Sequence, residues 1–406
     1  MMTTTGTLKS SIFMLLQSTL GTGILTLPFA FRSAGAFGGI ALLTFYCLAS
    51  VGAHYILIAA TDAAKAQSYS DIINYYMDKK WKNIFSIIIA AYSFVSIISS
   101  FVIVKHTLSI YASHSSFIPI LGAVVISFPL SIMRRMTHLK YGAFVSFTIW
   151  ICIVCMIIFC SKDPNGEATM TMWGESSFIR AIPQISLSFH AHIQLPSIYA
   201  DLKFSNRTPA LMMRAVMIAY SIIWLLYVLV ASFGYSRFGT RTCSNIMACP
   251  YNHQFIVLGR TGVAFTAILS IPIYNLSIRD AMWSFMTKGF RNELLVSKVV
   301  VVVMKNEEEE SSTKLNHQRQ EITMKKIYMS TAAVLFSAAM FALPVKELST
   351  LSALTGMIGG VAVMYILPSI FVWKRKTESN VGAVVYFGVG VLTFVACGCS
   401  FLGVVG

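Results

Sequence analysis

Long apolar stretches separated by short polar connections dominate this chain of 406 residues. A helix needs about 20 apolar residues to cross a lipid bilayer. The pattern therefore predicts eleven membrane-spanning helices, over residues 8–31, 37–60, 83–104, 117–133, 141–160, 178–199, 210–235, 255–278, 327–344, 348–373 and 381–405. We expect them to form one transmembrane domain over residues 1–406, an all-α integral membrane protein.

Basic residues predict how this domain is oriented. Most of the 31 Lys and Arg residues fall before the first span or in the connections after the even-numbered spans. Because positively charged loops are retained on the cytoplasmic side, the N-terminus is expected in the cytoplasm and Gly406 outside. The same rule makes residues 288–324 a cytoplasmic loop, and the acidic run Glu307 to Glu310 suggests that this loop is solvated and flexible.

Three cysteines fall on the outer side in this topology. Cys243 and Cys249 share one outer loop, and Cys160 lies at the outer end of the fifth span. An oxidising compartment permits a disulfide there. Sequence alone leaves open whether Cys243 and Cys249 pair with each other or one of them with Cys160.

The composition agrees with a membrane protein and excludes several other classes. Hydrophobic residues make up 56% of the chain and charged residues 12%, with a mean hydropathy of +0.70. Soluble domains carry about 25% charged residues, so a soluble enzyme is excluded. A disordered chain is excluded as well, because disorder requires low hydrophobicity. The net charge of +15 does not indicate a nucleic-acid partner, because the basic residues lie in short clusters between apolar stretches rather than on one folded face.

The first span contains a break in its apolar pattern. Gly21-Thr22-Gly23 is followed five residues later by Pro28. Unwinding at such a break frees N–H groups that can bind a carboxylate and carbonyls that can hold an ammonium group or a cation. A close-packed face of small residues is the alternative. The candidate substrate-binding residues here are Thr19, Gly21, Thr22, Gly23 and Ile24.

The sixth span has a similar break. It contains two prolines, two serines, two glutamines and two histidines, and ionisable groups at membrane depth usually face a pathway. Ser188, Phe189 and His190 are candidate substrate-binding residues. His190 and His192 are two positions apart and point to different sides of a helix, so at most one should face the site.

The two broken spans occupy corresponding positions in two halves of the chain. They begin about 170 residues apart, and each is followed by four further spans. This spacing predicts a five-plus-five inverted repeat, with repeat one over about 8–160, repeat two over about 178–373 and an extra helix over about 381–405.

At these residues the chain resembles the amino acid/auxin permease family, which includes sodium-coupled neutral and vacuolar amino acid transporters. The first-span motif is Ser11-Ile12-Phe13 leading into Gly21-Thr22-Gly23-Ile24-Leu25-Thr26-Leu27-Pro28. The sixth-span motif is Ser188-Phe189, then His192, then Ile198-Tyr199-Ala200-Asp201-Leu202. The resemblance implies a LeuT-like core, with substrate contacts from the backbone around Thr22 to Ile24 and from Ser188 to His190.

The resemblance also implies candidate residues for cation coupling. Gln17 stands where sodium-coupled members have an asparagine, and Ser270 in the eighth span is the nearest match to a hydroxyl partner. The longer amide of Gln17 would not reproduce the asparagine geometry, so proton coupling through His190 or His192 is the competing option. No cofactor or resident metal is expected beyond a co-transported proton or sodium ion.

The predicted function is secondary active transport of amino acids by alternating access. No Asp or Glu lies deep inside a predicted span, and a cationic substrate without a counter-charge would be costly there, so neutral amino acids are favoured. An amino acid sensor with little net transport is the alternative. Neither an HExxH motif nor paired intramembrane aspartates occur, so an enzyme is not expected. The membrane is either the plasma membrane or a vacuolar or lysosomal membrane.

Overall fold

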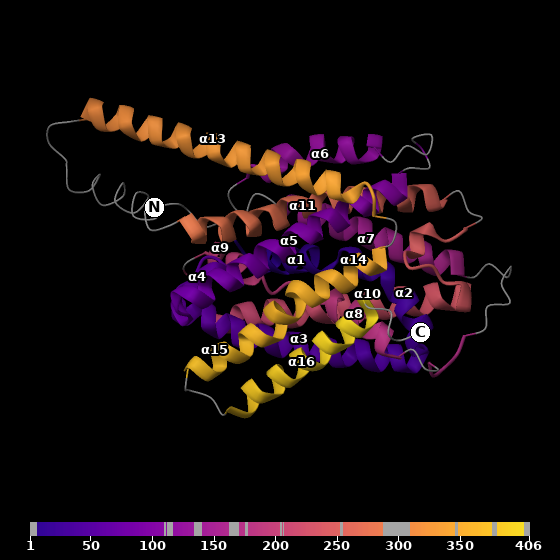
Figure 1. The fold of residues 1–406 in the computed structure, drawn as a ribbon. Helices are drawn as coiled ribbons and strands as arrows, with labels where there is room; N and C mark the ends of the chain where they lie inside the picture. Colours follow the sequence, from indigo (N-terminus) through magenta and orange to yellow (C-terminus); the bar gives the residue numbers. More distant parts are fainter. Residues whose placement is uncertain are drawn as a thin grey trace.

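Helices build almost all of the chain that the structure describes. The computed structural model describes residues 6–108, 111, 117–133, 140–161, 170–174, 178–203, 205, 207–251, 255–286, 309–345, 348–375 and 380–401. Within these ranges there is no β-strand, and one isolated bridge joins Gly6 to Leu202. Most helices run along one direction (Figure 1).

The helices follow the predicted apolar stretches. Their bounds are α1 Leu8–Thr19, α2 Thr22–Ala34, α3 Ala36–Ala64, α4 Tyr69–Tyr76, α5 Lys79–Leu108, α6 Phe117–Ser131, α7 Lys140–Ser161, α8 Phe178–Ser188, α9 Leu195–Asp201, α10 Pro209–Phe238, α11 Phe255–Met286, α13 Glu309–Ala342, α14 Leu348–Thr355, α15 Leu367–Arg375 and α16 Asn380–Phe401. Two π-helical turns, Gly356–Gly360 and Ala362–Ile366, connect α14 to α15.

The prediction of a helical membrane protein is confirmed, whereas the number of spans is not. Six of the described helices, α3, α5, α7, α10, α11 and α16, are long and apolar enough to cross a membrane. A seventh span results if α1 and α2, bent by 55° at their break, are counted as one. The helix α6 is apolar but has 15 residues, which is short for a full crossing.

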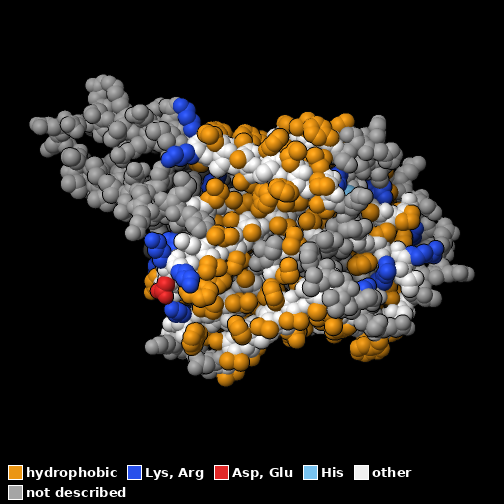
Figure 2. Space-filling model, in the orientation of Figure 1, with side chains coloured by type: hydrophobic (Ala, Val, Ile, Leu, Met, Phe, Trp, Pro, Cys, Tyr) orange, Lys and Arg blue, Asp and Glu red, His pale blue; other side chains and the backbone are white. Residues whose placement is uncertain are grey.

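The surface of the molecule has the polarity that a bilayer requires. Lys and Arg side chains gather toward the two ends, and apolar side chains fill the band between them (Figure 2). Leu48, Leu258 and Val384 come from three different helices and are each more than two-thirds exposed. A soluble protein does not leave so extensive an apolar surface open to water, so lipid is the solvent that fits this band.

Residues 309–324 of the predicted 288–324 loop are helical. Residues 287–308 lie outside the described residues, and α13 already begins at Glu309. The acidic run therefore ends in a helix that continues without interruption into the ninth predicted span. Similarly, α11 continues past its predicted end at residue 278 to Met286 and so includes Arg279 and Asp280.

Two buried cations hold the ends of neighbouring helices. The Lys105 ammonium group, on α5, donates to the carbonyls of Ala342 and Leu343, both at 3.0 Å, where α13 ends. The Arg279 guanidinium group, on α11, donates to the carbonyl of Met133 at 2.9 Å, just beyond the end of α6. The last carbonyls of a helix lack partners within the helix, so each cation caps a helix from outside.

Candidate functional site

The two predicted breaks lie against each other inside the bundle. The first break falls at Leu20 and Gly21, where the backbone leaves helical geometry between α1 and α2. The second falls between Ser188, the last residue of α8, and Leu195, the first of α9. At Gly23 the approach is so close that a Cβ atom would lie 2.6 Å from the Ser188 hydroxyl oxygen and 2.8 Å from its Cα.

Two tyrosines of α10 bind the backbone of the breaks. The Tyr227 hydroxyl lies 2.9 Å from the carbonyl oxygen of Thr19 and 2.7 Å from that of Ser188, so it can donate to either break. The Tyr220 hydroxyl donates to the carbonyl of Phe189 at 3.0 Å. Two carbonyls of the second break, those of Ser188 and Phe189, therefore each have a phenol donor within reach.

The start of α2 offers hydrogen-bond donors instead. Gly21 is its N-cap residue and provides no side-chain cap. The first N–H groups of a helix have no partner within the helix, and the helix dipole favours negative charge at that end. This end of α2 can therefore bind a carboxylate.

His190 and Tyr274 close the space beside Gly21. The imidazole Nδ1 of His190 lies 2.7 Å from the Leu187 carbonyl, and Nε2 lies 2.7 Å from the Tyr274 hydroxyl. Since a carbonyl only accepts, Nδ1 carries the proton, and in the neutral ring Nε2 accepts from Tyr274. A Cβ atom at Gly21 would lie 4.0 Å from both His190 Cε1 and the Tyr274 hydroxyl oxygen.

Two small cavities flank Tyr274. One is lined by Gly21, Ser270 and Tyr274 together with apolar side chains, and the other by His190, Tyr274 and hydroxyl groups of α5. Each has room for about one water molecule. In this conformation neither could hold an amino acid unless the surrounding helices separated.

The two predicted cation-coupling residues on α1 and α11 are in contact. The Gln17 amide nitrogen donates to the Ser270 hydroxyl at 3.2 Å, although the residues are 253 positions apart. The Ser270 hydroxyl in turn donates to the Thr266 carbonyl at 3.0 Å. The amide oxygen of Gln17 is buried and has no hydrogen-bond partner among the described residues.

The remaining predicted residues occupy different places. Thr19 is buried and its hydroxyl donates to the Leu15 carbonyl at 2.8 Å, so its backbone, not its side chain, faces the break. Ile24 and Phe189 are fully buried. Thr22 is the first residue of α2, and its side chain lies outside the described part of the chain.

His192 is separate from these cavities. Its ring packs against that of His54 on α3, with 4.0 Å between the ring centroids. Sequence reasoning missed His54 and the tyrosines at positions 220, 227 and 274. Each lies in a mainly apolar span, where a tyrosine or histidine is more often a packing residue. Only the contacts that each makes at the breaks or with His192 identify it.

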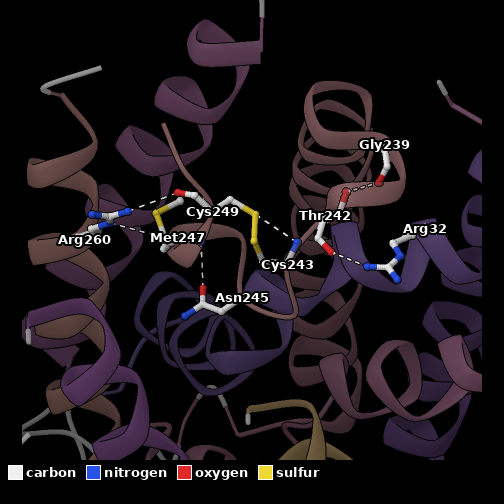
Figure 3. Close-up of a disulfide and its surroundings, with 8 residues drawn as sticks. All are labelled: Arg32, Gly239, Thr242, Cys243, Asn245, Met247, Cys249 and Arg260. Carbon is white, nitrogen blue, oxygen red and sulfur yellow. Dashed lines mark hydrogen bonds between the residues drawn. A yellow bond between two sulfur atoms is a disulfide. The ribbon is translucent and has the colours of Figure 1, made fainter. Parts of the chain in front are cut away.

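A disulfide fixes the connection between α10 and α11. It joins Cys243 to Cys249, not to Cys160, with 5.7 Å between the Cα atoms (Figure 3). Two arginines from neighbouring helices bind this loop. Arg260 of α11 donates to the carbonyl of Met247 at 2.8 Å, and Arg32 of α2 donates to that of Thr242 at 3.0 Å (Figure 3).

Comparison with known proteins assigns the family. A family model described as transmembrane amino acid transporter protein matches residues 4–406. The chain belongs to this family. The resemblance drawn from the two span motifs is therefore confirmed. The description of the family indicates membrane transport rather than catalysis as its general activity.

Relatives within the transmembrane amino acid transporter family agree. The chain is 23% identical to the putative sodium-coupled neutral amino acid transporter 11 of Rattus norvegicus, over 96% of this chain and 83% of that protein. It is 19% identical to the vacuolar amino acid transporter 6 of Saccharomyces cerevisiae, over 96% and 95% of the two chains. The names of these relatives include both sodium-coupled and vacuolar transporters.

Proposed function

We propose that this protein is a secondary active transporter that moves neutral amino acids across a membrane by alternating access, driven by a proton or sodium gradient. The observation that carries the proposal is the meeting of two helix breaks at Gly23 and Ser188. The uncapped start of α2 supplies N–H groups for the substrate carboxylate. The ammonium group would compete with Tyr227 and Tyr220 for the carbonyls of the breaks.

A neutral substrate fits the lining of the site. Hydroxyl groups, aromatic rings, His190 and apolar side chains line the two described cavities, and no Asp, Glu, Lys or Arg is among these lining residues. A charged substrate side chain would be left without a counter-charge at membrane depth, which is costly. The zwitterionic backbone of an amino acid, in contrast, finds partners of both signs at the breaks.

Eleven spans with a LeuT-like five-plus-five core form part of the proposal. In such a repeat the third and eighth spans are equivalent, as are the fourth and ninth. The two helix caps follow this equivalence. Lys105, just after the third predicted span, binds the end of the ninth, and Arg279, just after the eighth, binds the segment after the fourth. The two breaks, in the first and sixth spans, are a second equivalent pair.

Alternating access is supported by how completely the site is enclosed. Ser188, His190 and Gln17 are all buried. Backbone contacts join segments at two places away from the breaks: Gly6 N–H donates to the Asp201 carbonyl at 3.1 Å, and Gly174 N–H donates to the Ala34 carbonyl at 2.8 Å. We infer that these contacts separate in turn when the site opens to either side.

Uptake of labelled amino acids into proteoliposomes tests the proposal. A panel of neutral, acidic and basic amino acids is combined with an imposed proton gradient, a sodium gradient or neither. We expect gradient-stimulated accumulation of neutral amino acids under one of the two gradients. Binding without turnover would instead indicate a sensor, whose output should then depend on residues 288–324. If no gradient stimulates uptake of any amino acid, the transport proposal is wrong.

The orientation and location follow the charge pattern. We propose a cytoplasmic N-terminus, with the Cys243–Cys249 loop on the opposite side, in the plasma membrane or a vacuolar or lysosomal membrane. The disulfide in that loop supports this orientation, since an oxidising compartment favours such a bond.

A further inference from the structure

A pair of buried histidines lies behind the second break. His54 of α3 and His192 are 0% and 1% exposed, and their ring centroids are 4.0 Å apart. Neither ring nitrogen of His192 makes a hydrogen bond with the described residues. The Ser50 carbonyl lies beside both rings. A buried imidazole without a partner is costly unless it gains one in another state of the protein.

The chain of polar contacts around His54 has one more contact than it has protons to donate. His54 Nδ1 lies 2.7 Å from the Ser50 carbonyl and must donate to it, so Nε2 of the neutral ring is an acceptor. Nε2 lies 3.3 Å from the Tyr220 hydroxyl, which is also 3.0 Å from the Phe189 carbonyl. Three contacts thus share two protons, because the single hydroxyl proton of Tyr220 can serve only one of two acceptors at a time.

We propose that the His54–His192 pair is the proton-binding site through which transport is coupled to a proton gradient. This inference rests on the proposed function and names its coupling ion. A proton on His54 Nε2 completes the chain, because His54 then donates to Tyr220 and Tyr220 donates to Phe189. When the proton leaves, the Tyr220 hydroxyl turns to Nε2 and releases the Phe189 carbonyl, which belongs to the second break.

The surroundings of the pair limit it to one proton. The titratable groups that face it are Tyr220 from α10, Tyr365 from the second π-helical turn, and His190. The Cys47 thiol of α3 lies against the Tyr220 backbone carbonyl. None of these is a carboxylate that could neutralise a second charge. Two imidazolium rings this close would repel strongly in a buried site. His192 is therefore placed to pass the proton to or from His54.

The test compares variants of the full-length protein in proteoliposomes that contain a pH-sensitive dye. The variants are His54→Gln, His192→Gln and Tyr220→Phe. The control is His106→Gln, in the last turn of α5 and outside the pair. The substrate is the neutral amino acid with the largest uptake in the panel. Accumulation under a pH gradient and proton entry are measured, together with exchange of labelled for unlabelled substrate at equal pH.

The wild type and the control should accumulate substrate with proton entry. A gradient of about one pH unit supports at most about tenfold accumulation for each co-transported proton. Both histidine variants should lose accumulation and proton entry but retain exchange, which needs no net proton movement. Tyr220→Phe keeps both imidazoles but cuts their link to Phe189, so its uptake should lose its dependence on pH.

Several results would overturn the inference. Sodium-driven uptake without proton entry in the wild type would overturn the proton site but leave the transport proposal intact. Unchanged proton entry in both histidine variants would have the same two consequences. If those variants fail even in exchange, the pH dependence of Tyr220→Phe decides: an unchanged profile rejects the site and a flattened one supports it. A wild type that responds to no gradient rejects the transport proposal itself.

Discussion

Gly23 shows how one side chain can decide whether the two breaks meet. A methyl group there would overlap Ser188, and one of the overlapping atoms, the Ser188 Cα, belongs to the backbone and cannot rotate away. The first-span motif marks this glycine in the sequence. Its importance nevertheless depends on a contact between residues that lie far apart along the chain.

We therefore predict that Gly23→Ala abolishes transport. The added Cβ would lie well inside van der Waals contact distance of Ser188, so α2 and α8 must separate and the site loses its geometry. Gly388→Ala in α16 is the matched control, because a Cβ there meets no atom within 4 Å. Uptake in proteoliposomes is measured for both. Normal uptake by Gly23→Ala would show that the breaks need not approach so closely.

Tyr227→Phe removes the hydroxyl that contacts both breaks. We expect a loss of stability of about 1 kcal/mol, as for a typical hydrogen bond, together with a large loss of transport. Tyr46→Phe removes a buried hydroxyl of α3 that instead lies 2.9 Å from the Thr393 hydroxyl of α16, and this variant should lose similar stability but keep transport. Thermal unfolding and uptake separate the two effects. Equal uptake by the two variants would contradict a role for Tyr227 at the breaks.

At the scale of elements, two cations bind helices that are distant in the sequence. Lys105 joins α5 to the end of α13, and Arg279 joins α11 to the segment after α6. The helices α5 and α11 also form the most extensive helix–helix contact in the described structure. These four helices thus make a unit that is fixed by buried caps, whereas α1, α2, α8 and α9 carry the breaks.

Lys105→Met and Arg279→Met should each destabilise this unit. Either change leaves buried carbonyls without a charged donor, and hydrogen bonds to charged groups contribute about 1.5–3 kcal/mol. Lys65→Met is the control, since that side chain is 80% exposed and its ion pair with Asp62 contributes little. Thermal unfolding in detergent or lipid measures the loss. A transition temperature equal to that of the control in both variants would show that the caps do not stabilise the bundle.

At the scale of the whole molecule, the charge pattern predicts a testable topology. The native sequon Asn206-Arg207-Thr208 should be cytoplasmic and unglycosylated in a eukaryotic host. Glu167→Thr creates a sequon at Asn165 in a connection expected outside, and it should add one glycosidase-sensitive glycan. A glycan on the native protein at Asn206 would reverse the orientation. The shift is read by gel mobility before and after glycosidase treatment.

The membrane class, most of the long helices and the positions of both breaks follow from the sequence alone. These are local properties: span length follows from bilayer thickness, and unwinding follows from Gly and Pro among apolar residues. The family motifs lie at the same places. The sequence also marks Gln17, Ser270, His190 and His192 as polar exceptions, and the family resemblance pairs Gln17 with Ser270. It does not indicate which groups His190 and His192 would contact.

Most of the contacts between distant groups at the site depend on how the helices pack. The expected pairing of Gln17 with Ser270 is a hydrogen bond across 253 positions, whereas the contacts of Tyr227 with the carbonyls of both breaks were not expected. The His192 ring packs against the His54 ring, and His190 Nε2 forms a hydrogen bond with the Tyr274 hydroxyl. These contacts form because backbone groups freed inside a membrane must find partners within the protein. Which side chains reach them depends on how the helices pack.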